Sequence, residues 1–315
     1  MTFKVTILGS GSALPAAGKH HSAHVLNVHE QFYLVDCGEG TQSRLMRCGI
    51  PLLKLNAVFI THLHGDHLFG LFPMISTLGL LGRRTPLHLF GPGPLNEMLD
   101  FHLRHFDTQL PFEVKFHEAD TRSYACLYEN KVLEVWSVPL RHRIPCTGYL
   151  FREKTPPLNV RRDAVERYGL GIAQCVAAKR GEDVAVDTES GPLLLPNAEI
   201  AYRPYEPRSY AYLSDTLYSA KAASLVRGAD LLYHEATFAD ADRALARQTG
   251  HSTTLQAAKA ALAAGAERLL IGHFSARYKD DEAMASEART LFPNTEAAVE
   301  GRTYAIAPRT NPLKC

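Results

Sequence analysis

Short apolar runs rich in β-branched and aromatic residues recur along the chain, separated by polar segments that contain glycine, proline or charged residues. Runs of this length and composition predict β-strands. The strands are expected at 5–8, 32–36, 57–60, 87–90, 132–138, 211–215, 231–234 and 268–273.

Other segments have helical spacing and helical end signals. Residues 253–264, TTLQAAKAALAA, place Thr253 and Gln256 in capping-box spacing, and Gly265 provides a C-terminal stop. A second helix is expected at 281–292, where a proline follows. Strands mixed with helices predict an α/β protein whose sheets are covered by helices.

One segment departs from this pattern. From 152 to about 196 the alternation of strands is lost, and several prolines and glycines interrupt the chain. Within 152–181 there are seven Lys or Arg against three Asp or Glu. Composition alone favours a solvated surface insertion. The alternative is a protruding arm that contacts a polyanion.

Length and composition limit the possible classes of protein. The chain has 315 residues, 46% hydrophobic and 21% charged, which is enough for a large core in one or two domains. The net charge of +1 requires any nucleic-acid site to be a local basic patch. The start lacks a signal-peptide pattern, and the apolar stretch 68–82 is shorter than the roughly 20 residues that span a bilayer. The six cysteines form no C-x-x-C pair, which is typical of reduced thiols. We therefore expect a soluble cytoplasmic protein with no membrane partner.

The densest chemistry follows the strand at 57–60. Residues 62–67 read HLHGDH and offer His62, His64, Asp66 and His67 as ligands. Histidines at i and i+2 of an extended segment project to the same side, and the glycine permits a turn into a helix. Imidazoles and a carboxylate suit zinc, and this many ligands suggests two adjacent metals. A polar loop with incidental histidines is the alternative, since the chain has 15 histidines, but four ligand-type residues in six positions disfavour it.

Three further ligand-type residues follow apolar runs. They are His142, Asp215 and His273. In α/β folds, sites form at the carboxyl ends of strands, so these residues are candidates to complete a dinuclear site of seven ligands. Taken singly, His142 fits a surface residue between two arginines, and Asp215 fits a turn.

These stretches carry a family resemblance. HLHGDH resembles the signature of the metallo-β-lactamase superfamily, whose fold is a four-layer αβ/βα sandwich. The resemblance narrows to the short form of the ribonuclease Z family, tRNA 3′-processing endonucleases, and extends from about residue 3 to residue 280. The stretches that carry it are LGSGSALP at the start, VDCGEGTQ (35–42), Ser214-Asp215-Thr216, HEATF (234–238), His251-Ser252-Thr253 and His273-Phe274-Ser275.

The resemblance implies a role for each matching residue. One zinc would take His62, His64 and His142, the other would take Asp66, His67 and His273, and Asp215 would bridge the two. Asp36 would support the metal loop without binding metal. Glu235 and His251 would form a relay at the leaving group. Without the resemblance, Asp36 fits a turn, and Glu235 and His251 fit structural positions.

The resemblance also implies a reaction and a substrate. Two Zn²⁺ per subunit, roughly 3.5–4 Å apart, would activate a water that attacks phosphorus, with Asp66 orienting the water or taking its proton. His251, supported by Glu235, would protonate the departing 3′ oxygen. The products would be a tRNA with a 3′-hydroxyl and a trailer with a 5′-phosphate. The site chemistry would serve any phosphodiester.

Selectivity for precursor tRNA would come from an arm at 152–196, inserted in a single domain that spans 1–315. In a homodimer of this family, the arm holds tRNA at the partner's active site. Two features depart from the family pattern. The arm lacks the usual Gly-Pro motif, reading GLGIAQCVAAKRGED at 169–183, and Ser214 stands where glycine commonly precedes the bridging aspartate.

Several alternative functions remain at this stage. The principal one is a phosphodiesterase of the same fold that acts on small or cyclic phosphodiesters. A β-lactamase usually lacks this bridging aspartate, and a thioesterase does not need the HEATF and HST stretches. A non-catalytic RNA-binding protein predicts a damaged ligand set, whereas all seven positions are filled. A redox di-iron site favours a carboxylate where His64 stands, and Mn²⁺ could replace zinc at these nitrogen and oxygen ligands.

Overall fold

A computed structural model describes residues 1–106, 109–188 and 191–308. The chain divides into two compact units. The main unit contains Met1–Arg152 and Ser209–Ile306, and the inserted unit contains Glu153–Arg208 with the described residues after Ile306.

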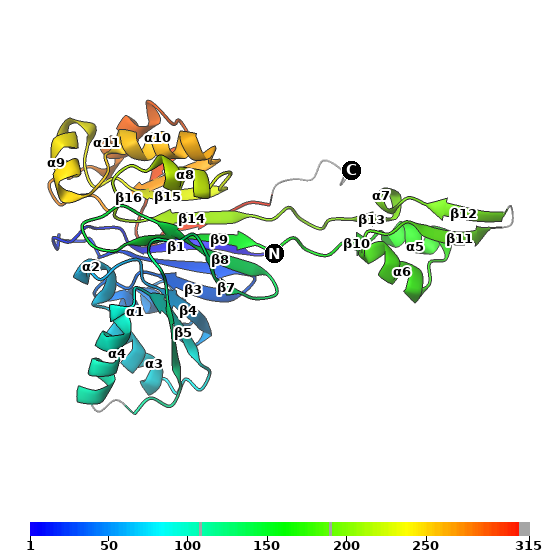
Figure 1. Cartoon of the computed structure of the whole chain (residues 1–315), viewed down its shortest axis with the longest axis horizontal. Coiled ribbons are helices and arrows are strands. Elements are labelled where there is room, and N and C mark those ends of the chain that lie inside the picture. The colour runs from blue at the N-terminus through cyan, green and yellow to red at the C-terminus, as the bar shows by residue number, and fades with distance from the viewer. Residues whose placement is uncertain (107–108, 189–190, 309–315) are drawn as a thin grey trace. The chain divides into compact units, whose positions relative to one another are not determined.

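The main unit is built on two mixed seven-stranded sheets (Figure 1). The first sheet has the order β18 (Thr303–Ala305), β1 (Phe3–Gly9), β2 (Ala23–Val28), β3 (Gln31–Val35), β4 (Leu55–Phe59), β5 (Leu87–Gly91) and β6 (Val114–Glu118). The second has the order β17 (Thr295–Ala297), β16 (Arg268–Gly272), β15 (Leu231–Glu235), β14 (Ser209–Leu213), β9 (Thr147–Glu153), β8 (Leu133–Pro139) and β7 (Cys126–Glu129).

Helices cover the outer face of each sheet (Figure 1). Over the first sheet lie α1 (Thr41–Arg47), α3 (Leu71–Leu80) and α4 (Pro94–His105). Over the second lie α8 (Ala220–Leu225), α10 (Thr254–Ala264) and α11 (Asp281–Arg289). The short helices α2 (Gly65–Leu68) and α9 (Arg243–Thr249), with two 3-10 turns at Leu52–Lys54 and Asp240–Asp242, complete the unit. The four-layer αβ/βα prediction is confirmed.

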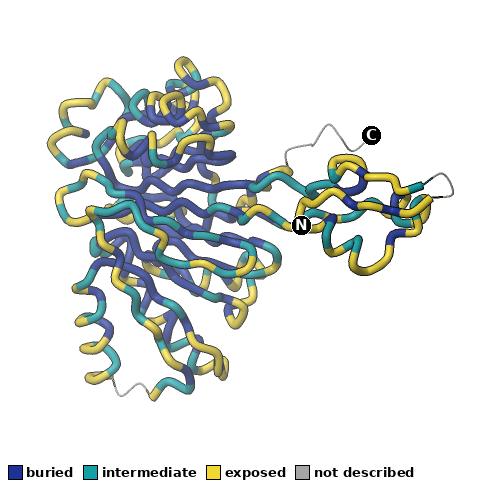
Figure 2. The backbone as a smooth tube through the Cα atoms, turned by 45° about the vertical axis from the view of Figure 1, so that its right-hand side comes forward, coloured by how far each residue is buried: buried dark blue, intermediate teal, exposed yellow. Residues whose placement is uncertain are grey.

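Three apolar layers hold these elements together, one between the sheets and one beneath each set of helices. Strand alternation produces this arrangement, as β14 illustrates. Tyr210 and Tyr212 face the layer between the sheets, whereas Ala211 and Leu213 face the helices. Figure 2 shows that buried positions concentrate in the strands of the two large sheets.

Parallel strands set the position of the site. The strands β3 to β6 are parallel in the first sheet, as are β14 to β17 in the second. The segments 60–67, 214–216 and 273–275 follow the carboxyl ends of β4, β14 and β16. Candidate ligands from both halves of the chain therefore lie at strand ends, as expected for α/β folds.

The predicted strands and the first predicted helix are confirmed. Thr253 caps α10 through the predicted capping box with Gln256, and Gly265 ends it in the left-handed region at φ 58°. The second predicted helix was too long, because α11 ends at Arg289. The strands β2, β6, β7, β9, β17 and β18 were not predicted. Polar residues interrupt the apolar pattern in several of these strands, as in VKFHE of β6.

The inserted unit has secondary structure of its own. It contains β10 (Asn159–Val160), α5 (Arg162–Tyr168), α6 (Ile172–Lys179), β11 (Val184–Thr188), β12 (Gly191–Leu195), α7 (Asn197–Ile200) and β13 (Ala201–Tyr202) around a small apolar core. The expected absence of strands over 152–196 was therefore wrong, since these strands are short and mostly exposed. A buried ion pair of 2.6 Å between Glu153 and Arg208 joins the ends of the unit.

Within the described part of the chain, none of the helices combines the length and the apolar character that crossing a membrane requires.

Candidate metal centre

The segment after β4 presents the HLHGDH residues through a defined backbone. Ile60 donates its N–H to the carbonyl of Phe90, and Thr61 accepts from the N–H of Thr147 on the other sheet. His64 is extended, with φ −70° and ψ 147°, and α2 begins at Gly65. A Cβ at Gly65 would lie 2.4 Å from the ring of Phe69, so a larger residue there would have to displace that exposed ring.

The first group of candidate ligands consists of three histidines and one aspartate. The Nε2 atom of His62 lies 3.0 Å from Nδ1 of His64, and Nε2 of His142 lies 3.3 Å from the same atom. Oδ2 of Asp215 lies 3.6 Å from Nε2 of His62 and 3.8 Å from Nε2 of His142. Four potential ligand atoms from three separate stretches of chain therefore converge.

The second group shares Asp215 through its other oxygen. The Nε2 atoms of His67 and His273 are 3.3 Å apart, and both lie 3.4 Å from Oδ1 of Asp215. Oδ2 of Asp66 lies 3.4 Å from Nε2 of His67 and 3.3 Å from Nε2 of His273. The structure thus brings all seven predicted ligand residues into two adjacent groups, with Asp215 between them.

These distances fit metal coordination. Ligand nitrogen and oxygen atoms about 2.0–2.1 Å from a zinc ion lie roughly 3.4 Å from one another in a tetrahedron. The separations within both groups are close to this value. Three histidines with a carboxylate, beside two histidines with two carboxylates, are donor sets that suit zinc.

The electrostatics of the site also favour metal ligands. Burial lowers the pKa of His62, His64 and His142, so these imidazoles are neutral and keep a lone pair for a metal. Burial raises the pKa of Asp66 and Asp215, but the surrounding histidines outweigh burial and hold both pKa values below the ordinary range. Both aspartates are therefore ionised.

The other ring nitrogen of four histidines is held by a neighbouring group. The pairs are Nδ1 of His62 with Oγ1 of Thr61 (3.0 Å), His67 with Asp36 (2.7 Å), His142 with the carbonyl of Gly250 (2.9 Å) and His273 with Oγ1 of Thr237 (2.9 Å). Each contact leaves Nε2 directed at the centre of its group. Gly250 has φ 81°, and a Cβ there would lie 3.0 Å from His142.

Asp36 lies beneath the loop rather than in either ligand group. It is fully buried, and its carboxylate accepts from the N–H and hydroxyl of Thr61 as well as from His67. Asp36 and His273 both have positive φ, 56° and 61°. Backbone strain of this kind in residues other than glycine concentrates at functional sites.

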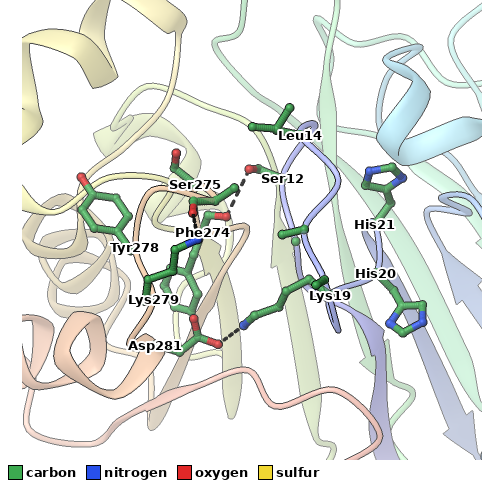
Figure 3. A pocket seen from close by; sticks show the side chains of 14 residues that line it. Ser12, Leu14, Lys19, His20, His21, Phe274, Ser275, Tyr278, Lys279 and Asp281 are labelled. Atoms are coloured by element: carbon green, nitrogen blue, oxygen red, sulfur yellow. Dashed lines mark hydrogen bonds and ion pairs between the residues drawn. The ribbon is translucent and has the colours of Figure 1, made fainter.

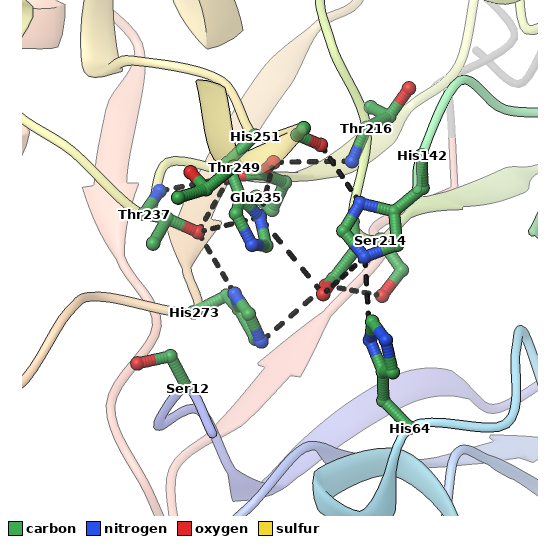
Figure 4. A network of polar contacts seen from close by, with 12 residues as sticks. Ser12, His64, His142, Ser214, Thr216, Glu235, Thr237, Thr249, His251 and His273 are labelled. Atoms are coloured by element: carbon green, nitrogen blue, oxygen red, sulfur yellow. Dashed lines mark hydrogen bonds and ion pairs between the residues drawn. The ribbon is translucent and has the colours of Figure 1, made fainter. Parts of the chain in front are cut away.

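Glu235 and His251 form the predicted pair beside the second group (Figure 4). The buried Glu235 carboxylate accepts from the backbone N–H groups of Thr216, Thr237 and Ser252, and from Nδ1 of His251 at 3.1 Å. Burial lowers the pKa of His251, but the charge and hydrogen bond of Glu235 outweigh it and raise this pKa to about 9. His251 is therefore protonated at neutral pH and can donate a proton.

Two threonines of the site were missed by sequence reasoning. Thr61 and Thr237 each hold a histidine of a ligand group, and Thr237 also donates to Glu235. The sequence could have suggested them only because Thr61 precedes HLHGDH and Thr237 lies within HEATF. Threonine is a common residue, and its contacts depend on the fold.

A pocket of about 310 Å³ opens over both groups, and Arg143 is the one lysine or arginine among its described lining residues. A neighbouring pocket of about 200 Å³ shares Ser12, Leu14 and Ser275 with it (Figure 3). Lys19 and Lys279 line this second pocket, and Lys19 pairs with Asp281. The metal pocket is thus open to solvent, and Lys279 lies in the pocket beside it.

Comparison with known proteins agrees with this site. A family model described as Anti-Pycsar protein Apyc1 matches residues 3–115. The chain is 43% identical over 298 residues to ribonuclease Z of Bacteroides fragilis, covering 95% of this chain and 97% of that protein. It is 41% identical over 304 residues to ribonuclease Z of Parabacteroides distasonis, covering 96% and 99%.

Solved structures show the same fold. Human tRNase Z, short form, has a TM-score of 0.68 at 26% identity and covers 96% of this chain and 99% of its own. The metallo-β-lactamase fold protein YhfI of Bacillus subtilis has a TM-score of 0.68 at 20% identity, covering 97% and 100%. The two facing sheets, with their histidine and aspartate groups at strand ends, define a protein of the metallo-β-lactamase fold. Within that class, the chain belongs to the ribonuclease Z family.

Proposed function

We propose that this chain is a zinc-dependent endoribonuclease that removes the 3′ trailer from precursor tRNA in the cytoplasm. Membership of the ribonuclease Z family makes it a hydrolase of the endoribonuclease class. The observation that carries the proposal is the pair of convergent ligand groups that share Asp215.

In this proposal, His62, His64 and His142 would hold one Zn²⁺, and Asp66, His67 and His273 would hold the second. Asp215 would serve both ions, because its Oδ2 lies near His62 and its Oδ1 lies near His67. When bound, the two ions polarise phosphate oxygens and lower the pKa of water. The neutral imidazoles of His62, His64 and His142 and the ionised carboxylates of Asp66 and Asp215 are the protonation states that such binding needs.

The protein residues supply orientation and proton transfer. Asp66 lines the pocket and is ionised, so its carboxylate can orient the attacking water or take its proton. The water oxygen bonds to phosphorus, and the bond from phosphorus to the 3′ oxygen breaks. His251, held by Glu235, donates its proton to that oxygen, because a free alkoxide is a poor leaving group. The tRNA keeps a 3′-hydroxyl and the trailer keeps a 5′-phosphate.

The inserted unit is proposed to grip tRNA. It carries exposed basic residues, including Arg162, Arg167, Lys179 and Arg180, and phosphate contacts of this kind supply affinity without sequence readout. It lies at the position where the family carries its tRNA-binding arm. Without the Gly-Pro motif, this chain would rely on these cations.

A homodimer is part of the same proposal. A groove of about 760 Å³ on α3 and α4 of the main unit exposes Phe69, Phe101 and Phe106. Exposed aromatic clusters of this kind are common in subunit interfaces, so a second copy of the chain is the proposed occupant. Light scattering should give the mass of two chains, and Phe101→Glu should shift it toward one. A wild-type monomer at micromolar concentration would contradict dimerisation.

The proposed function is tested with an end-labelled precursor tRNA. Cleavage should release a trailer with a 5′-phosphate, stop with a metal chelator and return with added Zn²⁺ or Mn²⁺. A small phosphodiester tested in parallel separates the alternative function. Equal or exclusive preference for the small diester would overturn the proposal in favour of a small-molecule phosphodiesterase.

A further inference from the structure

Two buried tyrosines of the second sheet reach across the sandwich toward the metal loop of the first. Tyr149 on β9 and Tyr212 on β14 are register partners in an antiparallel strand pair, and both side chains face the layer between the sheets. Each is 0% exposed. A buried tyrosine hydroxyl needs a hydrogen-bond partner, so the partners indicate what each tyrosine holds in place.

Tyr212 is hydrogen-bonded to Asp36, the residue that holds His67. Its hydroxyl donates to Oδ2 of Asp36 at 3.0 Å, and the same oxygen lies 2.7 Å from Nδ1 of His67. Thr61 and His67 come from the segment that follows β4, whereas Tyr212 comes from the opposite sheet. Among the donors to the Asp36 carboxylate in the described residues, Tyr212 is therefore the one that links it to the second half of the chain.

Tyr149 is bonded to the backbone of the same segment. Its hydroxyl donates to the carbonyl of Ile60 at 2.6 Å, two residues before His62. Ile60 is the first residue after β4, which ends at Phe59. The Tyr149 hydrogen bond therefore fixes the position of the backbone from which the His62 and His64 side chains extend into the site.

Packing fixes the direction of both hydroxyls. The ring of Tyr212 stacks on Tyr233 at 4.8 Å with an interplanar angle of 7°, and His24 meets its edge at 4.8 Å. Tyr149 meets Phe59 edge-on at 5.2 Å. Burial raises the pKa of both tyrosines well above the ordinary value, so both remain protonated donors. Locked rings with fixed donors are the arrangement by which supporting residues orient metal ligands.

The ligand residues are divided between the two sheets, so hydrogen bonds between the sheets affect the distances between ligand atoms. His62, His64, Asp66 and His67 follow β4 of the first sheet, whereas His142, Asp215 and His273 follow strands of the second. Their ligand atoms must meet within a few tenths of an ångström for a metal to bind well. The hydrogen bonds of Tyr149 and Tyr212 cross between the sheets, and they hold the two sets of ligand residues in fixed positions relative to each other.

We propose that Tyr149 and Tyr212 are positioning residues that hold the HLHGDH segment against the second sheet and thereby set the affinity of the centre for metal. This rests on the metal assignment of the proposed function, but not on the identity of the RNA substrate. Neither tyrosine is a ligand or touches substrate. Both act through Asp36 and the backbone of the loop.

The test uses Tyr212→Phe and Tyr149→Phe, which keep the rings and remove only the hydroxyls. The matched control is Tyr33→Phe, because Tyr33 is buried in the same layer between the sheets but its hydroxyl pairs with Gln31 at 2.7 Å and with Asn130 at 2.9 Å. Zinc affinity is measured by competition with a chromogenic chelator, with zinc content measured by mass spectrometry. Unfolding of the metal-free proteins gives the purely structural effect.

We expect each of the first two variants to bind zinc about 10-fold more weakly, the loss typical of removing an outer hydrogen bond to a ligand. Tyr33→Phe should keep the wild-type zinc affinity while losing comparable stability in the metal-free state. Unchanged affinity in Tyr212→Phe and Tyr149→Phe, or an equal loss in Tyr33→Phe, would overturn the inference. Wild-type protein that binds no divalent metal would overturn the proposed function together with it.

Discussion

Asp215 has a position that other ligand candidates do not share. Its two oxygens face different groups, one toward His62 and His142 and the other toward His67 and His273. It is 2% exposed, so its charge is stabilised by these histidines rather than by water. Loss of this carboxylate should therefore weaken both metal positions, whereas loss of a single histidine affects one.

The first prediction compares Asp215→Ala with His64→Ala. Both should lower precursor tRNA cleavage by about 10³-fold or more, because metal ions supply several kcal/mol of transition-state stabilisation. Asp215→Ala should reduce bound zinc at both positions and His64→Ala mainly at one. Cleavage rates and metal content are the measurements. Full activity in either variant contradicts the metal assignment.

The second prediction concerns Glu235 and the pH profile. The carboxylate raises the pKa of His251 to about 9, so the proton donor is present at neutral pH and is lost as pH rises through that value. Glu235→Gln removes the charge and should move the alkaline decline of kcat to lower pH, toward the ordinary histidine value of about 6.5. Activity at pH 8 should fall more than activity at pH 6.

A pH profile of cleavage for both proteins checks this. His251→Ala should remove the alkaline decline altogether while lowering the rate, by about 10²–10⁴-fold for a lost general acid. An unchanged alkaline decline in Glu235→Gln would show that His251 does not titrate in the reaction.

At the scale of elements, the inserted unit is separate from the chemistry. It has its own small core and its own strand pairs, and every described residue that lines the metal pocket belongs to the main unit. Changes on its surface should therefore alter RNA binding without altering the metal site.

The third prediction uses charge reversal on α6. Lys179→Glu with Arg180→Glu should raise KM for precursor tRNA. The slope of the logarithm of the binding constant against the logarithm of salt concentration should become shallower by about two units, since each lost phosphate contact removes roughly one unit. Hydrolysis of a small phosphodiester should be unchanged. Lys221→Glu with Arg227→Glu, exposed on the main unit, is the control with the same charge change. Equal losses for both substrates would refute the tRNA-binding role of the inserted unit.

At the scale of the molecule, the ligand set joins the two halves of the sandwich. Ligands follow β4 in the first sheet and β8, β14 and β16 in the second. A bound metal would therefore cross-link the sheets, and binding to the folded state alone stabilises that state by mass action.

The fourth prediction is that chelator lowers the free energy of unfolding. Zinc at 100 times its dissociation constant adds about 2.7 kcal/mol per site, and removing it should reverse that gain. Urea denaturation with and without chelator measures the difference, and Asp215→Ala should be much less sensitive to chelator. Identical unfolding curves for wild type in both conditions would contradict metal binding at this centre.

Local signals were sufficient for the ligand candidates and much of the fold. HLHGDH, His142, Asp215 and His273 could be selected because they are metal-binding residue types placed where apolar runs stop. The cap of α10 was readable because Thr253, Gln256 and Gly265 act within one helix. The strands of the inserted unit could not be predicted in this way, because strands that are two residues long or mostly exposed leave little apolar pattern.

The sequence by itself determined which residues could bind metal and that helices would cover the sheets, because residue chemistry and hydrophobic period are local properties. Only the tertiary structure decided that Thr237 joins His273 to Glu235 and that Tyr212 reaches Asp36. Tyr212 and Asp36 lie 176 positions apart in the chain. Tyrosine and threonine are common residues, and these contacts form only when distant strands pack together. No local sequence pattern can therefore predict these contacts.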